Sequence, residues 1–242
     1  MGTETVQVGL GERSYPIVIG SGVLDTVGAA LAEARIGRRW AIITDDVVGP
    51  LYGGRLVDLL GAAGIDCELI TFAHGESSKH LVTIGTLASE LAERGFDRGD
   101  AVLALGGGVV GDMAGFLASI YLRGIPFVQV PTSLLAQVDS SVGGKTGVDL
   151  DQGKNLVGTF YQPRAVFIDT DVLRTLPEAE FRGGMGEVIK YGASIDSDFF
   201  AFLERERSAI QRLEPAAIVP MIRRSCELKA SVVERDEREG GL

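Results

Sequence analysis

The stretch AVLALGGGVVGD at residues 101–112 decides the fold of this chain. Its apolar beginning, Ala101–Leu105, predicts a buried strand. The glycines behind it have the spacing G-x-G-x-x-G from Gly106 to Gly111, which joins a strand to a helix in dinucleotide-binding folds. We therefore expect a glycine turn here, followed by a helix over Asp112–Leu122 that Asp112 caps.

Two features distinguish this stretch from an ordinary dinucleotide fingerprint. The fingerprint usually follows the first strand of its unit, with an acidic residue about 20 positions later. Here it follows a third strand, and no acid occurs between Asp112 and Asp139. The acids available for ribose hydroxyls are instead Asp45, Asp46 and Glu76. The glycines therefore indicate either a cofactor loop or a tight turn that needs glycine for its backbone alone.

Strand and helix patterns alternate on both sides of this stretch. The further strands are expected at Val6–Val8, Tyr15–Ile19, Trp40–Thr44, Cys67–Phe72, Phe127–Val130 and Ala165–Ile168. The helices between them are expected from beyond Gly22 to about Arg35, over Gly53–Ala63 and over Lys79–Arg94. This βαβαβ order predicts an α/β fold, a parallel sheet with helices on both faces.

From Pro177 onward the strand patterns disappear. Helices are expected over Glu178–Tyr191, Asp198–Leu213 and Pro215–Glu237. We therefore divide the chain into an α/β sheet domain at 1–176 and an all-helical domain at 177–242. Three helices make only a thin domain. We therefore expect the helical part to be incomplete.

The composition excludes some partners. The chain has 45% hydrophobic residues, enough for a real core, and a formal net charge of −10. Nucleic acids and acidic membrane surfaces require clustered Lys and Arg, so we expect neither as a partner. The apolar run at 103–120 is interrupted by glycines and Asp112, so it does not predict a membrane-spanning helix.

Cys67 and Cys226 lie far apart in apolar surroundings and are expected to be buried, reduced thiols. The N-terminus shows neither a secretion signal nor a lipidation signal. These observations favour a cytoplasmic location.

Several polar residues occur in glycine-rich or turn-like settings. The hydroxyls of Thr132 and Ser133 follow a strand and can either cap the next helix or bind a phosphate. Lys145 follows Gly143-Gly144, but the complete phosphate-loop spacing of an NTPase is missing. Lys154-Asn155 follows Gly153 in a similar way. These lysines are either solvated surface residues or clamps for an anion, and we expect both to lie in loops.

Glu187 and Lys190 lie three residues apart on an expected helix and therefore share a face. They form either an ordinary ion pair or part of a metal site with Glu187 as a ligand. The only histidines, His74 and His80, do not lie where a helical partner of Glu187 would fall. The sequence therefore does not complete a metal site.

Taken together, several blocks of this sequence resemble the 3-dehydroquinate synthase family, and the resemblance covers essentially the whole chain. The blocks are Gly106–Asp112, Arg123-Gly124, Pro131–Lys145, Gly153–Asn155 and Gly186–Gly192. The resemblance implies a cytoplasmic, homodimeric lyase of the shikimate pathway, which serves aromatic amino acid biosynthesis and depends on NAD and on Zn²⁺ or Co²⁺. It implies conversion of a small phosphorylated sugar acid, 3-deoxy-arabino-heptulosonate 7-phosphate, to 3-dehydroquinate and phosphate. The reaction would proceed in four steps: transient oxidation by NAD, phosphate elimination, reduction and aldol closure.

The resemblance also implies site residues. Those expected to bind NAD are Asp45, Glu76, Lys79, Gly107, Gly108, Val109, Val110, Gly111, Asp112, Thr132, Ser133, Lys145, Lys154, Val172, Leu173, Arg174 and Thr175. Those expected to bind and convert the substrate are Arg123, Asp139, Lys145, Asn155, Lys190, Lys229 and Glu239. Glu187 is the expected metal ligand.

The family continues beyond Leu242 into a segment that carries two histidine ligands, so further metal ligands are expected past this residue. The resemblance therefore implies a C-terminally truncated chain, inactive by itself. Three alternatives remain open: a related cyclase that makes inosose-type or valiolone-type rings, a metal-dependent polyol dehydrogenase, and a non-catalytic NAD-binding fragment.

Overall fold

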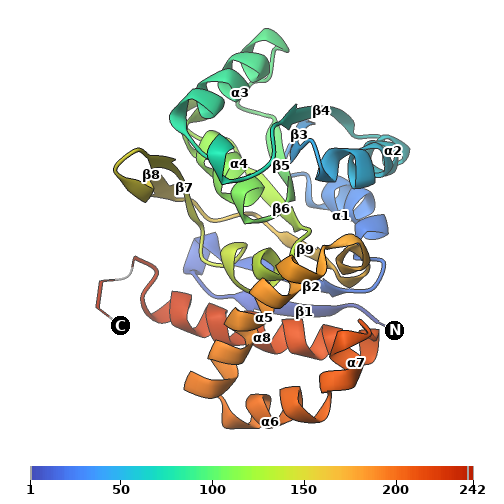
Figure 1. Ribbon diagram of the computed structural model, residues 1–242. Coiled ribbons are helices and arrows are strands. Elements are labelled where there is room, and N and C mark those ends of the chain that lie inside the picture. Colours follow the sequence, from blue (N-terminus) through green and yellow to red (C-terminus); the bar gives the residue numbers. More distant parts are fainter. Residues whose placement is uncertain (1, 239, 242) are drawn as a thin grey trace.

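The computed structural model describes residues 2–238, 240 and 241, and its described part contains a seven-stranded sheet in the order β1-β2-β9-β6-β5-β3-β4 (Figure 1). β1 and β2 are antiparallel, and every other neighbouring pair is parallel. The strands are β1 (Glu4–Val8), β2 (Tyr15–Gly20), β3 (Arg39–Asp45), β4 (Asp66–Phe72), β5 (Ala101–Gly106), β6 (Phe127–Pro131) and β9 (Val166–Asp169). The sequence prediction of a mainly parallel α/β fold is therefore confirmed.

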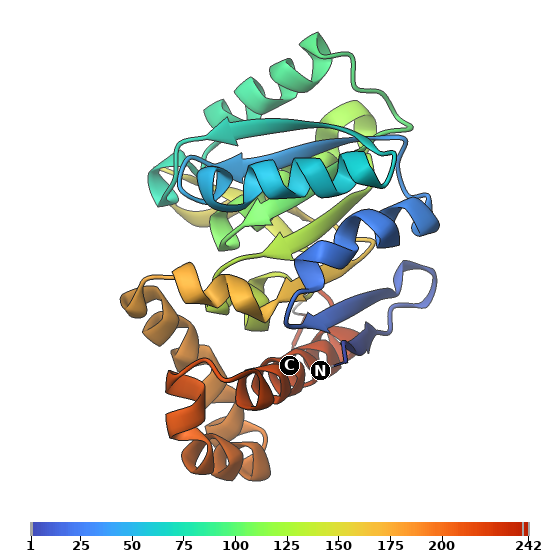
Figure 2. The ribbon, with the colours of Figure 1, turned by 90° about the vertical axis from the view of Figure 1, so that its right-hand side faces the viewer.

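Helices cover both faces of the sheet because the central strands are apolar on both sides. Trp40 and Ile42 face one core, whereas Ala41 and Ile43 face the other. The helices on the Trp40 side are α1 (Val27–Ala34) and α2 (Gly54–Ala62), and those on the Ala41 side are α3 (Leu81–Glu93) and α4 (Gly108–Ile120). Figure 2 shows this layered arrangement from the side.

The last part of the chain is helical, as expected. It comprises α5 (Glu178–Ser194), α6 (Ser197–Arg205), α7 (Arg207–Gln211) and α8 (Pro215–Arg235). The expected single helix over 198–213 is wrong, because the chain leaves helical geometry at Glu206, where ψ is 6°. The predicted division of the chain at 176/177 remains a prediction.

The longest helix, α8, packs across the first two strands of the chain. Ile222 and Cys226 share a buried cluster with Val6 and Ile17. In Figure 1 the red helix α8 lies directly beside the blue strand β1. The beginning and the end of the described chain thus form one core.

An antiparallel hairpin of β7 (Lys145–Leu150) and β8 (Gly153–Phe160) projects from the sheet, where we expected loops. That expectation is wrong, because glycines at these positions allow the two strands and α4 to approach one another closely. A Cβ on Gly158 would lie 2.0 Å from the Thr146 carbonyl oxygen, and one on Gly115 of α4 would lie 2.4 Å from Thr146 Cγ2. The hairpin therefore pairs tightly and rests on α4.

Both cysteines are unpaired thiols, and Cys226 is buried as expected. The expectation for Cys67 is wrong, because it is only half-buried on β4. Among the residues that the structure describes, no helix combines the length and the apolar character that crossing a membrane requires.

Candidate active-site cleft

The order of the strands creates a crevice at one edge of the sheet. β3 and β5 are neighbours in the sheet. The strand that follows β3 in the chain, β4, lies on one side of this pair, and the strand that follows β5, β6, lies on the other, so the strand order reverses between β3 and β5. Ligands of open parallel sheets bind beyond the carboxyl ends of the strands at such a point. Asp45 ends β3 and Gly106 ends β5, so the predicted cofactor residues of these strands share this edge.

Helix α4 opens at this edge with bare backbone. It begins at Gly108, with Gly107 as N-cap, so the predicted start at Asp112 is wrong and Asp112 lies in the second turn. The first amides of a helix have no partner within it. A Cβ on Gly107 would lie 3.4 Å from Ser133 Oγ, and one on Gly108 would lie 3.1 Å from Ser140 Oγ. Gly108 thus packs closely against Ser140, and the amides at this positive end of the helix are of the kind that binds anionic groups.

Lys79, Asp112 and Asn155 form a polar cluster beside this helix, in which Lys79 is buried, Asp112 is partly buried and Asn155 is exposed. Lys79 Nζ lies 2.6 Å from Asp112 Oδ2 and donates to Asn155 Oδ1 across 2.5 Å. The Lys79 side chain is only 5% exposed. Burial raises the pKa of Asp112 to about 6, although the positive charge of Lys79 opposes this shift. The three predicted residues therefore come together from three distant segments.

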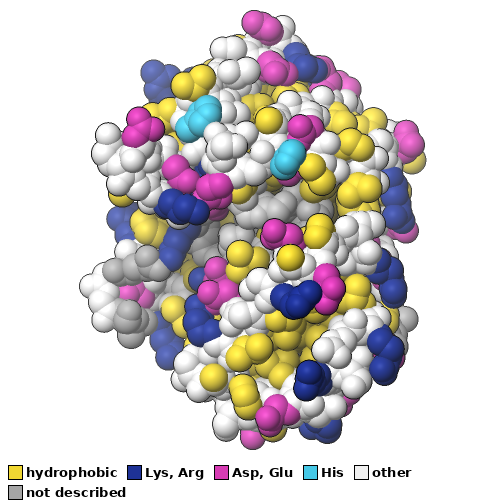
Figure 3. Space-filling view, viewed as in Figure 1, with side chains coloured by type: hydrophobic (Ala, Val, Ile, Leu, Met, Phe, Trp, Pro, Cys, Tyr) yellow, Lys and Arg dark blue, Asp and Glu magenta, His cyan; other side chains and the backbone are white. Residues whose placement is uncertain are grey.

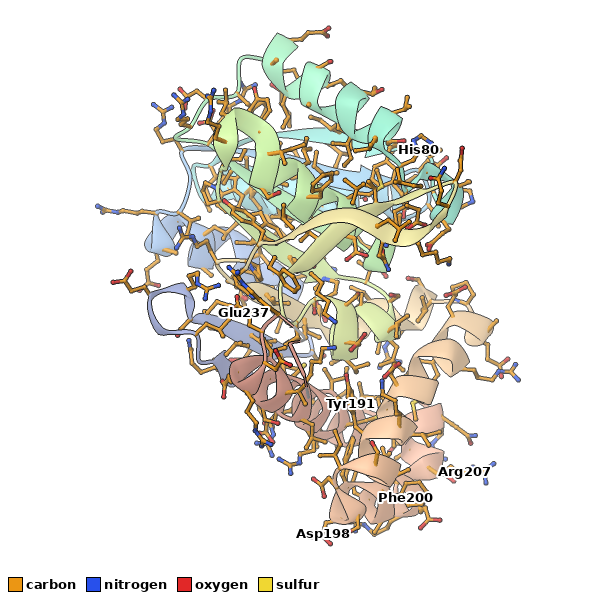
Figure 4. All side chains as sticks on the ribbon, turned by 90° about the vertical axis from the view of Figure 1, so that its left-hand side faces the viewer. His80, Tyr191, Asp198, Phe200, Arg207 and Glu237 are labelled. Atoms are coloured by element: carbon orange, nitrogen blue, oxygen red, sulfur yellow. The ribbon has the colours of Figure 1, made fainter. Side chains whose placement is uncertain are left out.

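The hairpin is held against the segment before α3. Lys79 O accepts a hydrogen bond from Asp149 N at 2.8 Å, and Lys154 Nζ lies 2.8 Å from Glu76 Oε1. Glu76 raises the pKa of Lys154. In Figure 4, His80 lies near the tip of the hairpin, consistent with a bridge between His80 and Asp149. Glu76 and Lys154, both expected at the cofactor, thus form the outer part of this contact.

A cleft of about 550 Å³ lies between the hairpin and α8. Its walls include five predicted site residues: Asp112, Asp139, Lys145, Asn155 and Lys229. In Figure 3, acidic and basic side chains gather on this side of the molecule, beside the hairpin. The structure therefore brings most of the predicted substrate residues into one cavity.

Asp139 is the centre of the inner wall. Its Oδ1 lies 2.7 Å from Lys229 Nζ and accepts a hydrogen bond from the Tyr191 hydroxyl at 2.9 Å. Burial by itself would raise the pKa of Asp139, but Lys229, Tyr191 and Lys190 outweigh it and hold this pKa below its ordinary value. The sequence analysis gave Tyr191 no role, and only its position next to Lys190 could have drawn attention to it.

Glu187 and Lys190 pair with each other on α5, as one of the two sequence interpretations expected. His74 instead contacts Asp46 Oδ1, and His80 caps α3 by accepting from Thr83 N. Across 2–238, 240 and 241, no three His, Cys, Asp or Glu side chains group in a way that could hold a metal. Glu187 could therefore supply one metal ligand, but the described residues do not place the further ligands of a metal site beside it.

Some predicted residues lie outside the cleft. Arg123 follows the far end of α4, near the start of β6, so this chain does not bring it to its own cleft. Asp45 accepts from the amides of Val47 and Val48 and stabilises the turn after β3. Glu239 lies outside the described residues.

The remaining predicted residues line the carboxyl edge of the sheet. Ser133 caps the following helical turn by accepting from Ala136 N at 3.3 Å, and Thr132 is buried. Residues 172–175 belong to a short 3-10 helix after β9, in which Val172 and Leu173 are buried and Arg174 and Thr175 carry polar contacts. These residues border the crevice but do not line the 550 Å³ cleft.

Comparisons with known proteins identify similar sequences and structures. The family model described as 3-dehydroquinate synthase N-terminal matches residues 69–183, and that described as 3-dehydroquinate synthase C-terminal matches residues 184–242. The 3-dehydroquinate synthase of Geobacter metallireducens is 53% identical over 239 residues, which are 99% of this chain and 66% of that protein. The chain thus spans about two thirds of the length of the curated relatives it matches.

Solved structures show the same fold. The 2-epi-5-epi-valiolone synthase of Streptomyces hygroscopicus, with NAD⁺ and Zn²⁺ bound, has a TM-score of 0.86 and 32% identity over 96% of this chain and 64% of that one. A 2-deoxy-scyllo-inosose synthase complexed with carbaglucose-6-phosphate, NAD⁺ and Co²⁺ has a TM-score of 0.82 and 28% identity over 98% of this chain and 65% of that one.

Proposed function

The chain belongs to the 3-dehydroquinate synthase family, and from this premise we propose that its protein converts 3-deoxy-arabino-heptulosonate 7-phosphate to 3-dehydroquinate and phosphate. The observation that carries the proposal is the cleft that joins Asp139, Lys145, Asn155 and Lys229. The chain covers about 66% of the length of a curated relative, so the complete reaction is proposed for the whole protein and ligand binding for these 242 residues.

The cofactor of this reaction is NAD, and the edge of the sheet fits it. The N-terminus of α4 would hold the pyrophosphate, and a side chain on Gly108 would crowd Ser140 beside it. Lys79 and Asp112 would lie beside it with Thr132 and Ser133. When bound, NAD supplies the transient oxidation of the C5 hydroxyl, which acidifies the neighbouring C–H.

The substrate carries a phosphate and a carboxylate, which the cleft can bind although the whole chain is acidic. Lys145 lies on the hairpin wall and Lys229 on the α8 wall, so an anion between them would contact both. Lys190, 58% exposed on α5, would join them from the side. Local cations thus offset the net charge of −10.

Asp139 would orient the substrate hydroxyls. Its lowered pKa keeps the carboxylate ionised near neutral pH, so it can accept hydrogen bonds from hydroxyl groups. Lys229 and Tyr191 hold this carboxylate in place through Oδ1. Asn155, fixed by Lys79, would extend the same row of polar groups.

The metal ion of the family does not fit the described residues alone. Glu187 would supply one carboxylate ligand, and a catalytic zinc site needs about three protein ligands. The described residues therefore do not complete a zinc site, and we assign no step to the ion.

We also propose a cytoplasmic homodimer. Arg123 follows α4 and does not line the cleft of its own chain, so we propose that it contacts substrate in the cleft of a second copy. Light scattering of the purified protein tests the dimer. The monomer mass would contradict it and remove the proposed role of Arg123.

The first measurement is the intact mass of the protein purified from its own cells. A species heavier than 25.6 kDa is then assayed with NAD⁺ and Zn²⁺ for phosphate release from 3-deoxy-arabino-heptulosonate 7-phosphate. Release of phosphate with formation of 3-dehydroquinate supports the proposal. Turnover only of substrates for valiolone-type or inosose-type rings would contradict it, and net NADH production would favour a dehydrogenase.

A further inference from the structure

A glycine turn, Gly143-Gly144, lies where the hairpin wall of the cleft meets the α8 wall. Gly143 and Gly144 have φ angles of 106° and 65°, and they directly precede Lys145. A Cβ on Gly143 would lie 2.9 Å from Val233 Cγ2 of α8, and one on Gly144 would lie 2.7 Å from Gln162 Cδ. The turn is therefore wedged between α8 and the segment that follows β8.

Hydrogen bonds from several elements fix this turn. Gly143 N donates to the buried Tyr15 hydroxyl at 3.1 Å, and Gly143 O accepts from Gln162 Nε2 at 3.0 Å. Gly144 O accepts from Tyr161 N at 2.7 Å. The backbone groups of the turn are thus held on both sides.

Glu237, just beyond α8, links Arg13 to Gln162, the residue that binds the carbonyl of Gly143. Both of its carboxylate oxygens accept from the guanidinium of Arg13, with Nη2 to Oε2 at 2.7 Å, and Oε1 also accepts from Gln162 Nε2 at 2.9 Å. Such a bidentate pair is charge-assisted and fixed in direction. Hydrogen bonding to Arg13 lowers the pKa of Glu237, whose side chain is only 16% exposed. Figure 4 shows Glu237 near the base of the hairpin.

We propose that Glu237 is a positioning residue that, through Arg13 and Gln162, fixes the turn before Lys145 opposite Lys229. Lys229 lies on α8, and Glu237 follows the end of the same helix. The contact therefore sets the separation of the two lysines that face the cleft. This inference rests on the proposed function, because it assumes that an anion binds between them.

The test compares wild-type protein with Glu237→Gln, Arg13→Gln and the double variant. Hydrogen exchange of the peptide over 141–146 reports the turn, and calorimetric titration with inorganic phosphate and with NAD⁺ reports the two binding sites. We expect faster exchange and a roughly fivefold higher phosphate Kd for either single variant, with a smaller loss of NAD⁺ affinity, because Lys145 is only one of many residues expected to bind NAD. The double variant should be no weaker than either single one, since both remove the same contact.

Glu227→Gln is the matched control. Glu227 also accepts from two arginines on α8, Arg223 and Arg224, but it does not contact the turn. It should change neither exchange at the turn nor phosphate affinity. Unchanged exchange in Glu237→Gln would overturn the inference, as would faster exchange with a phosphate Kd equal to that of the control. A wild-type protein that binds no phosphate would instead refute the proposed anion site, while the exchange result still decides whether Glu237 fixes the turn.

Discussion

The hydroxyl of Tyr191 donates a hydrogen bond to Oδ1 of Asp139 across 2.9 Å. The Tyr191 ring is buried, so its only polar atom serves a carboxylate in the wall of the cleft. Burial and the nearby Asp139 charge both raise the pKa of Tyr191, so the hydroxyl stays protonated and remains a donor. The first prediction follows from this contact.

Tyr191→Phe should raise the pKa of Asp139, because one of the groups that lower it is lost. Hydrogen bonds to charged groups contribute about 2 kcal/mol, so we expect a comparable loss of stability. Carbon-13 NMR of the carboxyl groups measures the pKa, and urea unfolding measures the stability. An unchanged pKa of Asp139 would contradict the prediction and show that Lys229 and Lys190 keep this pKa low without Tyr191.

Replacing Lys79 should destabilise the protein strongly. Lys79→Met leaves the buried carboxylate of Asp112 without its cation, which costs about 3 kcal/mol for a broken buried pair. Lys154→Met is the matched control, because its pair with Glu76 is exposed and should matter much less. Urea unfolding of both variants at pH 7.5 provides the comparison, and equal losses would contradict the prediction.

Asp112 should take up a proton near pH 6. Its pKa is about 6 in the folded chain and 3.8 as the ordinary value, so between these pH values the folded state binds more protons than the unfolded state. Its contribution to stability is therefore greatest below pH 4 and is lost as the pH rises through 6. The difference in unfolding free energy between wild type and Asp112→Asn, measured from pH 4 to 7.5, should show this slope. A difference that does not vary with pH would be inconsistent with it.

Gly158→Ala should separate the strands of the hairpin. Its Cβ would meet the Thr146 carbonyl at 2.0 Å, and such overpacking costs about 2 kcal/mol. Gly153→Ala on the same strand is the control, since its nearest neighbour would lie at an ordinary 3.4 Å. Hydrogen exchange over 145–160 should accelerate only in Gly158→Ala, and a slow-exchanging hairpin in that variant would refute the packing argument.

The sheet could be predicted from the sequence because its strands are short apolar runs between turn residues. Trp40–Thr44 and Ala101–Leu105 lie within β3 and β5. The hairpin could not, because Gly147 and Gly158 resemble loop residues unless their partners across the strands are known. The start of α4 was missed for a similar reason, since glycine is a poor helix former and Asp112 is a good cap.

The sequence predicted which residues belong to the cleft. It did not predict which of them contact one another. The sequence analysis named Asp139 and Lys229, yet only tertiary structure brings them 2.7 Å apart and adds Tyr191. Arg123 shows the opposite case. It belongs to the resembling motifs, but the length of α4 carries it to the other edge of the sheet.

The packing of α8 on β1 and β2 has a consequence for synthesis on the ribosome. β2 pairs with β9, so the first hairpin leaves the ribosome well before its neighbour in the sheet at Val166. At 5–20 residues per second, this interval lasts roughly 7–30 s. During that time Val6, Ile17 and Ile19 are an apolar nascent surface, because the α8 residues of the same buried cluster, such as Ile222 and Cys226, follow later still. The first two strands thus remain without part of their buried core until the residues of α8 have been synthesised.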